Sequence, residues 1–83
     1  MAQRIHWSDD AKADIRAFDR ITALRILNGL TRFISTGEGD VRALSGEFAG
    51  QLRLRLGDYR VIFTRSSEIL HILRVRNRRE AYR

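Results

Sequence analysis

The chain has no cysteine, no proline and a single lysine, Lys12, among its 83 residues. Without cysteine, it has neither a disulfide framework nor a cysteine-ligated metal centre, and its composition suits a reducing compartment. No stretch approaches the ~20 apolar residues that span a bilayer. The opening MAQRIHWSDD also lacks the apolar segment of a secretory signal. We therefore expect a soluble, cytoplasmic protein without a membrane partner.

Positive charge is concentrated in the C-terminal part of the chain. The net charge is +6, yet residues 1–50 carry seven cations and seven acids. Residues 51–83 carry nine arginines against three acids, which accounts for the whole excess. The planar guanidinium suits bidentate contact with phosphate and stacking on bases better than a lysine ammonium does. Nucleic acid is therefore the leading class of partner.

The length and the pattern of apolar residues predict one domain spanning residues 1–83. A chain of this size buries about 60% of its unfolded surface, enough for one helical layer against one sheet. Apolar periodicity predicts strands at 3–7, 51–56, 59–65 and 69–76 and helices at 9–19 and 21–35, whereas residues 41–50 show no clear period. The expected fold is α+β, in the order β-α-α-β-β-β. A helical hairpin would pack on one face of a twisted, mostly antiparallel four-stranded sheet.

Both expected helices show an apolar stripe. Ser8 is the expected N-cap of the first helix, and the buried residues Ala11, Ile15 and Phe18 follow at helical spacing. On the second helix the stripe comprises Leu24, Leu27, Leu30 and Ile34, widened by Ile26 and Phe33. We expect both stripes to face the sheet.

The segment LRLRLGDYRVIF, residues 52–63, predicts a β-hairpin with its arginines on one face. Gly57-Asp58 is a plausible two-residue turn of type II′, because glycine comes first. This turn would pair Leu56 with Tyr59, Arg55 with Arg60, Leu54 with Val61 and Arg53 with Ile62. The leucines would then pack on the helices, and Arg53, Arg55 and Arg60 would share the opposite face.

The register of the last strand depends on the turn before it. A two-residue loop at 66–67 would place Leu73 beside the arginines. A loop longer by one residue would place Arg74 and Arg76 there and turn His71 inward. We favour the longer loop, because it keeps Leu73 in the core.

Like charges directly opposite one another destabilise a sheet, so this face is expected to bind an anion. The alternative is a solvated face on which the arginines pair with the three acids of residues 51–83, which are too few to neutralise nine cations. Tyr82 lies among the arginines of the C-terminal tail. It would stack on a base or exchange a proton there, or else close the edge of the core. His6 and His71 are interpreted as structural, and no glycine-rich phosphate loop or HExxH motif is present.

Three segments together resemble the RelE/ParE superfamily of toxins from type II toxin–antitoxin pairs. They are IHWSDDAKADIRAF, RALSGEFAGQLRLRLGDYRVIF and LRVRNRREAYR, and together they extend over essentially the whole chain. The resemblance implies the β-α-α-β-β-β fold. It also implies one of two activities: the RelE-like branch cleaves mRNA, typically at the ribosomal A site, whereas the ParE-like branch poisons DNA gyrase.

The site implied by the resemblance is metal-free, needs no cofactor and consists of basic residues and a tyrosine. Arg53 and Arg55 match the two basic positions on the strand before the turn, Arg60 the arginine after the turn tyrosine, and Arg78 and Tyr82 the last two positions. The expected catalytic residues are Arg55, Arg60, Arg78 and Tyr82, and the expected RNA-binding residues are Arg53, Arg74, Arg76, Arg79 and Arg83.

Two departures from the family pattern bear on the chemistry. Many relatives carry lysine at the strand positions, and an arginine does not release its proton, so Tyr82 is the expected proton acceptor. Arg76-Asn77 replaces a glycine followed by histidine or lysine.

The expected function is therefore that of an mRNA interferase, a toxin that acts on mRNA and the ribosome and is held inactive by a cognate antitoxin. Arg60, Arg78 and Tyr82 favour this reading. The alternatives are a non-nuclease toxin that inhibits DNA gyrase and a non-catalytic nucleic-acid-binding module.

Overall fold

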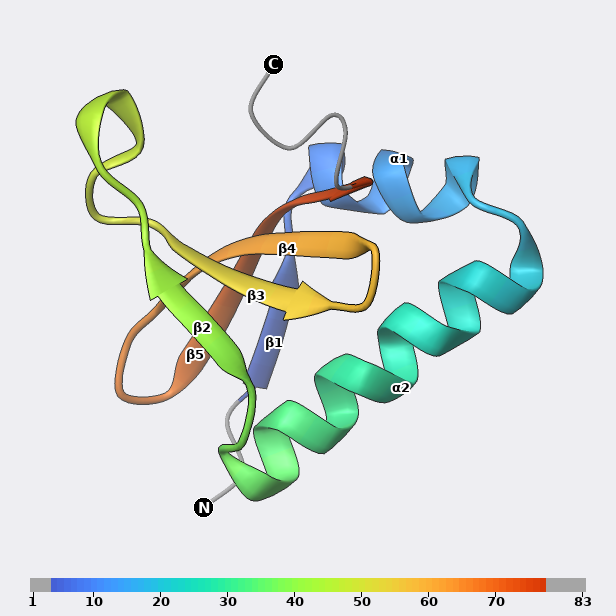
Figure 1. The fold of residues 1–83 in the computed structure, drawn as a ribbon, viewed down its shortest axis with the longest axis horizontal. Coiled ribbons are helices and arrows are strands. Elements are labelled where there is room, and N and C mark those ends of the chain that lie inside the picture. Colours follow the sequence, from blue (N-terminus) through green and yellow to red (C-terminus); the bar gives the residue numbers. More distant parts are fainter. Residues whose placement is uncertain (1–3, 78–83) are drawn as a thin grey trace.

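The computed structural model describes residues 4–77 and shows two helices on one face of a five-stranded sheet (Figure 1). The strand order is β1-β5-β4-β3-β2; β1 pairs with β5 in parallel, and the other neighbours are antiparallel. None of the helices in this part of the chain is long and apolar enough to span a membrane. The elements are β1 (Arg4–Trp7), α1 (Asp9–Ala17), α2 (Arg20–Thr36), β2 (Asp40–Ala43), the short 3-10 helix η1 (Gly46–Phe48), β3 (Leu52–Leu56), β4 (Tyr59–Arg65) and β5 (Ile69–Asn77).

Side-chain caps set where the helices begin. The hydroxyl oxygen of Ser8 accepts a hydrogen bond from the Ala11 backbone N–H (3.0 Å), so α1 begins where the sequence predicts. Asp19 caps α2 in the same way, accepting from the Thr22 N–H (3.1 Å) and hydroxyl (2.6 Å). Gly37, with φ of 73°, ends α2 in the left-handed conformation that glycine adopts most easily.

The core lies between the helices and the sheet. Ala11 of α1 and the α2 residues Ile26, Leu30 and Phe33 are buried against one face of the sheet. The sheet contributes Leu54, Val61, Phe63, Leu70, Ile72 and Val75. The predicted α+β class, with helices layered on one side of a mostly antiparallel sheet, is confirmed.

The strand count is five rather than the expected four. Asp40–Ala43 forms the edge strand β2 and pairs with β3, in a segment where the sequence shows no clear period. A four-residue strand contains only two alternations, too few to stand out from a loop.

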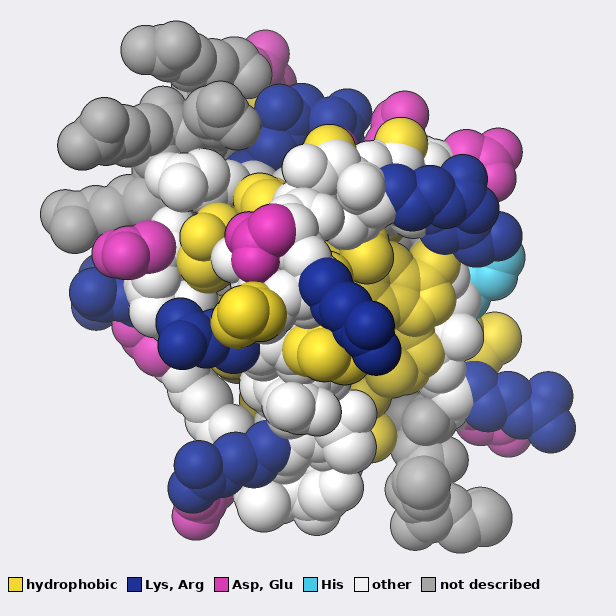
Figure 2. Space-filling model, turned by 90° about the vertical axis from the view of Figure 1, so that its right-hand side faces the viewer, with side chains coloured by type: hydrophobic (Ala, Val, Ile, Leu, Met, Phe, Trp, Pro, Cys, Tyr) yellow, Lys and Arg dark blue, Asp and Glu magenta, His cyan; other side chains and the backbone are white. Residues whose placement is uncertain are grey.

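The apolar stripe of α2 is rotated from the expected one. Burial falls on Ile26, Leu30 and Phe33, whereas Leu24 and Leu27 are 49% and 37% exposed. Ile21 is exposed as well, and Figure 2, which faces the side where α1 ends and α2 begins, shows hydrophobic side chains at the surface among basic ones. The expectation that Leu24 and Leu27 face the sheet was wrong, because apolar residues occupy two overlapping stripes and the sequence does not say which one the sheet covers.

The β3–β4 hairpin has the predicted register. Arg55 lies opposite Arg60, and Gly57 has φ of 62° while no described non-glycine residue has a positive φ, as a type II′ turn requires.

A bulge in β5 makes its register differ from both alternatives for the last strand. Arg65 pairs with Leu70, so the turn is longer than in either alternative; past the bulge, Val61 pairs with Val75 rather than with Leu73, the partner that the longer loop would give it, and Phe63 pairs with Ile72. Leu73 is therefore the extra residue of the bulge and is only partly buried, so its expected place in the core was wrong.

The bulge also moves His71 to the other face. It lies opposite Thr64 and beside His6, and the two imidazole centroids are 5.4 Å apart. The expected inward orientation of His71 was therefore wrong. One bulge lets Leu70 and Ile72 fill the core while Arg74 and Arg76 stay on the opposite face.

Candidate functional site

The sheet face opposite the helices carries arginines from four neighbouring strands, and we call it the arginine face. Strand pairing arranges it in two rows that run from β2 to β5. The first row is Asp40, Arg55, Arg60 and Arg76; the second is Arg42, Arg53, Ile62 and Arg74.

The first row places three like charges on consecutive strands. Neighbouring strands lie about 4.8 Å apart, so the Cα atoms of Arg55 and Arg76 are about 10 Å apart, with Arg60 between them. Arg60 is buried, with 7% of its surface exposed, and its Nη1 lies 3.4 Å from the carbonyl oxygens of Gly57 and Tyr59. Such a row costs stability in the free protein and favours an anion that bridges the guanidinium groups.

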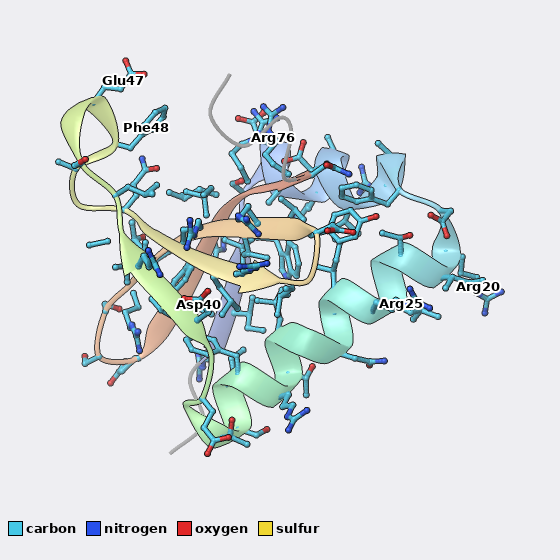
Figure 3. The ribbon with its side chains drawn as sticks, viewed as in Figure 1. Arg20, Arg25, Asp40, Glu47, Phe48 and Arg76 are labelled. Carbon is cyan, nitrogen blue, oxygen red and sulfur yellow. The ribbon has the colours of Figure 1, made fainter. Side chains whose placement is uncertain are left out.

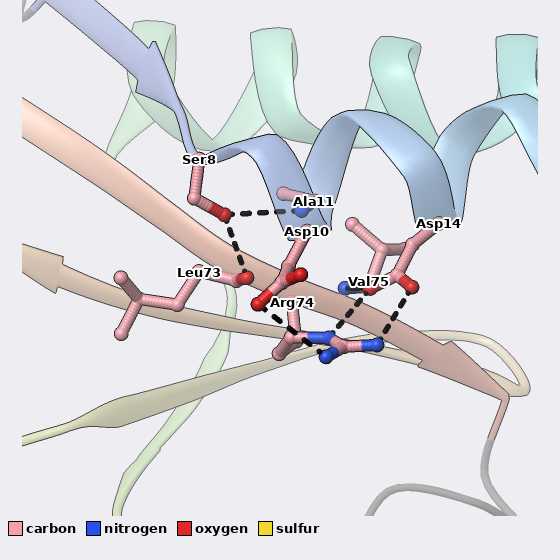
Figure 4. Close-up of polar contacts among 7 residues, drawn as sticks. All are labelled: Ser8, Asp10, Ala11, Asp14, Leu73, Arg74 and Val75. Atoms are coloured by element: carbon pink, nitrogen blue, oxygen red, sulfur yellow. Dashed lines mark hydrogen bonds and ion pairs between the residues drawn. The ribbon is translucent and has the colours of Figure 1, made fainter.

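Arg74, at the end of the second row, turns toward α1 (Figure 4). Its Nε and Nη2 donate to the carboxylate of Asp14 at 3.0 and 2.9 Å, and its Nη1 lies 3.6 Å from Asp10. The hydrogen bonds to Asp14 raise the pKa of Arg74 above its usual value. The guanidinium group of this predicted RNA-binding residue is therefore engaged within the protein.

Asp14 and Ser8 also secure the edge of β5 where β1 no longer covers it. β1 ends at Trp7, opposite Ile72. Beyond that point the Ser8 hydroxyl donates to the Leu73 carbonyl (2.8 Å), and the Asp14 carboxylate accepts from the Val75 N–H (2.8 Å). In this way α1 takes the place of a neighbouring strand and fixes the end of β5, including Arg76.

The sequence did not identify two members of the face, Asp40 and Arg42. Both lie on β2, and their carboxylate and guanidinium groups are 3.7 Å apart. The side chains are 46% and 73% exposed. The available signal was the alternation in DVRA, where the two charged residues point one way and Val41 the other.

The remaining predicted residues divide into two groups. The structure brings Arg53, Arg55, Arg60 and Arg76 onto one surface. Arg78, Arg79, Tyr82 and Arg83 lie outside the described residues. Within residues 4–77, no group of three or more His, Asp or Glu side chains is placed to hold a metal ion.

Several solved structures with the same fold are toxins or toxin–antitoxin complexes. The RelE–RelB complex from Pyrococcus horikoshii OT3 superposes with a TM-score of 0.74 and 24% identity, over 98% of this chain and 100% of that one. YafQ from E. coli strain BL21(DE3) gives 0.77 and 12%, over 98% and 99%. The RelBE2 complex from Mycobacterium tuberculosis gives 0.68 and 23%, over 94% and 100%. At these identities the likeness shows the fold, which is RelE-like.

The comparison with curated proteins finds no match. One family model matches residues 5–82, nearly the whole chain, and its description is the ParE toxin of the type II toxin–antitoxin system, parDE. Together with the RelE-like fold, this match shows that the chain belongs to the ParE toxin family of type II toxin–antitoxin systems, within the RelE/ParE superfamily.

Proposed function

We propose that this toxin is an mRNA interferase, a metal-independent endoribonuclease that cuts mRNA at the ribosomal A site and stops translation. The observation that carries the proposal is the row formed by Arg55, Arg60 and Arg76. Phosphates of an RNA strand would neutralise these like charges, and guanidinium groups bind phosphate with two parallel hydrogen bonds.

The proposed chemistry is attack of a ribose 2′-oxygen on the adjacent phosphorus. This reaction needs a group that takes the 2′ proton, cations that stabilise the negative charge of the phosphorane, and a proton for the departing 5′-oxygen. Arg55, Arg60 and Arg78 would stabilise the phosphorane, and Tyr82 would exchange a proton. Arg53, Arg76, Arg79 and Arg83 would hold the RNA strand, whereas Arg74 mainly holds β5 to α1.

The test is single-turnover cleavage of mRNA on programmed ribosomes, with RNA binding measured separately. Tyr82→Phe keeps the ring, so binding should persist while cleavage falls by about 10²–10⁴-fold, as after loss of an acid–base group. Arg60→Ala should weaken binding and cleavage together, because phosphate charge is present in both the ground state and the transition state. Arg32→Ala removes the same charge from the exposed surface of α2 and is the matched control. Wild-type cleavage by Tyr82→Phe would exclude a chemical role for that residue.

The second candidate function, inhibition of DNA gyrase, is favoured by the description of the matching family model as ParE. Induced expression followed by mapping of mRNA 5′ ends distinguishes the two. Cleavage of mRNA at a constant position relative to the codons of the reading frame supports the interferase, whereas intact mRNA with a DNA-damage response supports gyrase inhibition. RNA binding without cleavage would instead indicate a non-catalytic binding module.

The proposed partner is a cognate antitoxin that covers the arginine face, since solved proteins of the same fold include complexes of RelE with RelB. An acidic segment would neutralise the face, and a separate apolar segment of the antitoxin would fit the exposed Ile21 and Leu24 beside Arg20 and Arg25 on α2, on the other side of the sheet. Co-expression with the protein encoded by the neighbouring reading frame should abolish toxicity and raise the melting temperature, as any ligand of the native state does. Leu24→Ser should weaken that complex more than Arg32→Ala.

A further inference from the structure

The two rows of the arginine face supply charge stabilisation but little that can accept a proton. A guanidinium group has five N–H donors, no acceptor, and does not deprotonate in proteins. In the two rows that the structure describes, Asp40 is the acidic residue, and an ionised carboxylate is an acceptor that can take up a proton. The position of Asp40 relative to the arginines therefore bears on which group takes the 2′ proton.

Asp40 stands next to the arginines that would hold the reacting phosphate. It lies directly opposite Arg55, which lies directly opposite Arg60. Side chains at directly opposite positions have Cβ atoms about 4.5–5.5 Å apart, so a phosphate on Arg55 and Arg60 lies within a side-chain length of this carboxylate. Figure 3 shows Asp40 on β2 and Arg76 on β5, at opposite sides of the same group of strands.

The carboxylate of Asp40 remains accessible to a substrate. Its side chain is 46% exposed, and its ion pair with Arg42 is long, at 3.7 Å, and itself exposed. Exposed pairs of this kind contribute little stability, so the contact costs little to break when RNA binds.

We propose that Asp40 is the general base of the RNA cleavage, an inference that rests on the proposed function. Its carboxylate takes the proton from the ribose 2′-hydroxyl, and the 2′-oxygen forms a bond to phosphorus. The bond from phosphorus to the 5′-oxygen breaks, and that oxygen takes a proton from Tyr82 or water. The products are a 2′,3′-cyclic phosphate and a 5′-hydroxyl, and the protonated Asp40 returns its proton to solvent.

A different role for Asp40 predicts results of the opposite sign. If the carboxylate only balances the charge of Arg42, its removal takes a negative charge away from the phosphate, so RNA should bind more tightly and be cut at least as fast. If it is the general base, its removal should tighten binding or leave it unchanged while the reaction slows. Binding and cleavage must therefore be measured separately.

The experiment is single-turnover cleavage on programmed ribosomes at saturating protein. Asp40→Asn, which keeps the shape of the side chain, should bind RNA at least as tightly as wild type and cleave it about 10²–10⁴-fold more slowly. Asp40→Glu should recover much of the rate, because it restores a carboxylate. Glu38→Gln removes the same charge from the exposed loop before β2 and should behave as wild type.

Arg42→Ala separates catalysis from the ion pair. If Asp40 acted only by holding Arg42, this variant would lose as much rate at saturation as Asp40→Asn; the proposal expects a far smaller loss. Cleavage by Asp40→Asn at the wild-type rate or faster overturns the assignment and leaves the proposed function intact. A wild-type protein that binds the ribosome without cutting mRNA overturns both.

Discussion

Replacing Asp14 by alanine should markedly destabilise the protein, because its carboxylate joins α1 to β5. Its carboxylate, 14% exposed, accepts from the Val75 N–H and from two nitrogens of Arg74. Loss of the charge-assisted bond to Val75 costs about 1.5–3 kcal/mol. The pair with Arg74, whose side chain is 36% exposed, adds about 1 kcal/mol after screening by solvent. The expected loss is about 3 kcal/mol, or about 12–24 °C in Tm for a domain of this size.

Denaturant unfolding at equilibrium measures this loss, with Tm as a second readout. Asp14→Asn should cost less than Asp14→Ala, because its amide oxygen still accepts from Val75. Asp10→Asn is the matched control: its contact with Arg74 is 3.6 Å long and the Asp10 side chain is 74% exposed, so its cost should stay below about 1 kcal/mol. An Asp14→Ala protein that loses no more than this control would refute the reasoning that α1 secures the edge of β5.

Three further predictions follow from the structure. Gly39→Ala should lower the free energy of unfolding in urea by about 1–3 kcal/mol. The new Cβ would lie 2.8 Å from a methyl carbon of Leu54 and 3.0 Å from the ring of Phe33, both in the packed core. An unchanged urea midpoint would mean that the core rearranges to make room for the methyl group. Hydrogen bonds from the Thr22 hydroxyl and N–H lower the pKa of Asp19, so its contribution to stability is present above the ordinary value of 3.8 and is lost as pH falls through the lowered pKa; an Asp19→Ala variant should therefore lose less Tm than wild type between about pH 5 and pH 2. The logarithm of the RNA-binding constant should fall with the logarithm of the salt concentration at a slope of about −3 to −4, from roughly four to six phosphate contacts at about −0.7 each. Fluorescence anisotropy measures this slope, and an affinity that does not change with salt would exclude RNA phosphates as the ligand of the arginine face.

Local interactions made much of this fold predictable. The turn at Gly57-Asp58 fixes the pairing of β3 with β4 within a few residues, and the cap Ser8 stands directly before α1. Where one short segment determines the geometry, that geometry can be predicted from the sequence. The hairpin pairing and the start of α1 were therefore predicted correctly.

The features that were not predicted depend on distant parts of the chain. Which stripe of α2 is buried depends on how the helix lies on strands formed 20 or more residues later. The bulge at Leu73 arises because β5 must satisfy both β4 on one side and β1 with α1 on the other. Neither the buried stripe of α2 nor the bulge can be recognised from the local pattern of residues.

The candidate site divides in the same way. Arg53, Arg55 and Arg60 share a face because a single hairpin places them there, and the sequence identified them. The hydrogen bonds between Arg74 and Asp14 join residues 60 positions apart. Asp40 belongs to the site only because the four-residue strand β2, which the sequence did not predict, pairs with β3. The cations of the face were thus largely predictable, whereas its one described acid and the carboxylate that holds its edge were not.

The parallel pairing of β1 with β5 sets when the toxin becomes complete during its own synthesis. β5 is the last strand of the described chain, yet it lies between β1 and β4, and Arg4 at the start of β1 pairs with Ile69. Until β5 has left the ribosome, β1 has no neighbouring strand, and α1 lacks the edge to which Ser8 and Asp14 bind. The nascent chain therefore emerges with β1 and α1 undocked, and the sheet closes only after β5 has been synthesised. The arginine face, whose first row includes Arg76 on β5, is therefore completed only once β5 has been synthesised.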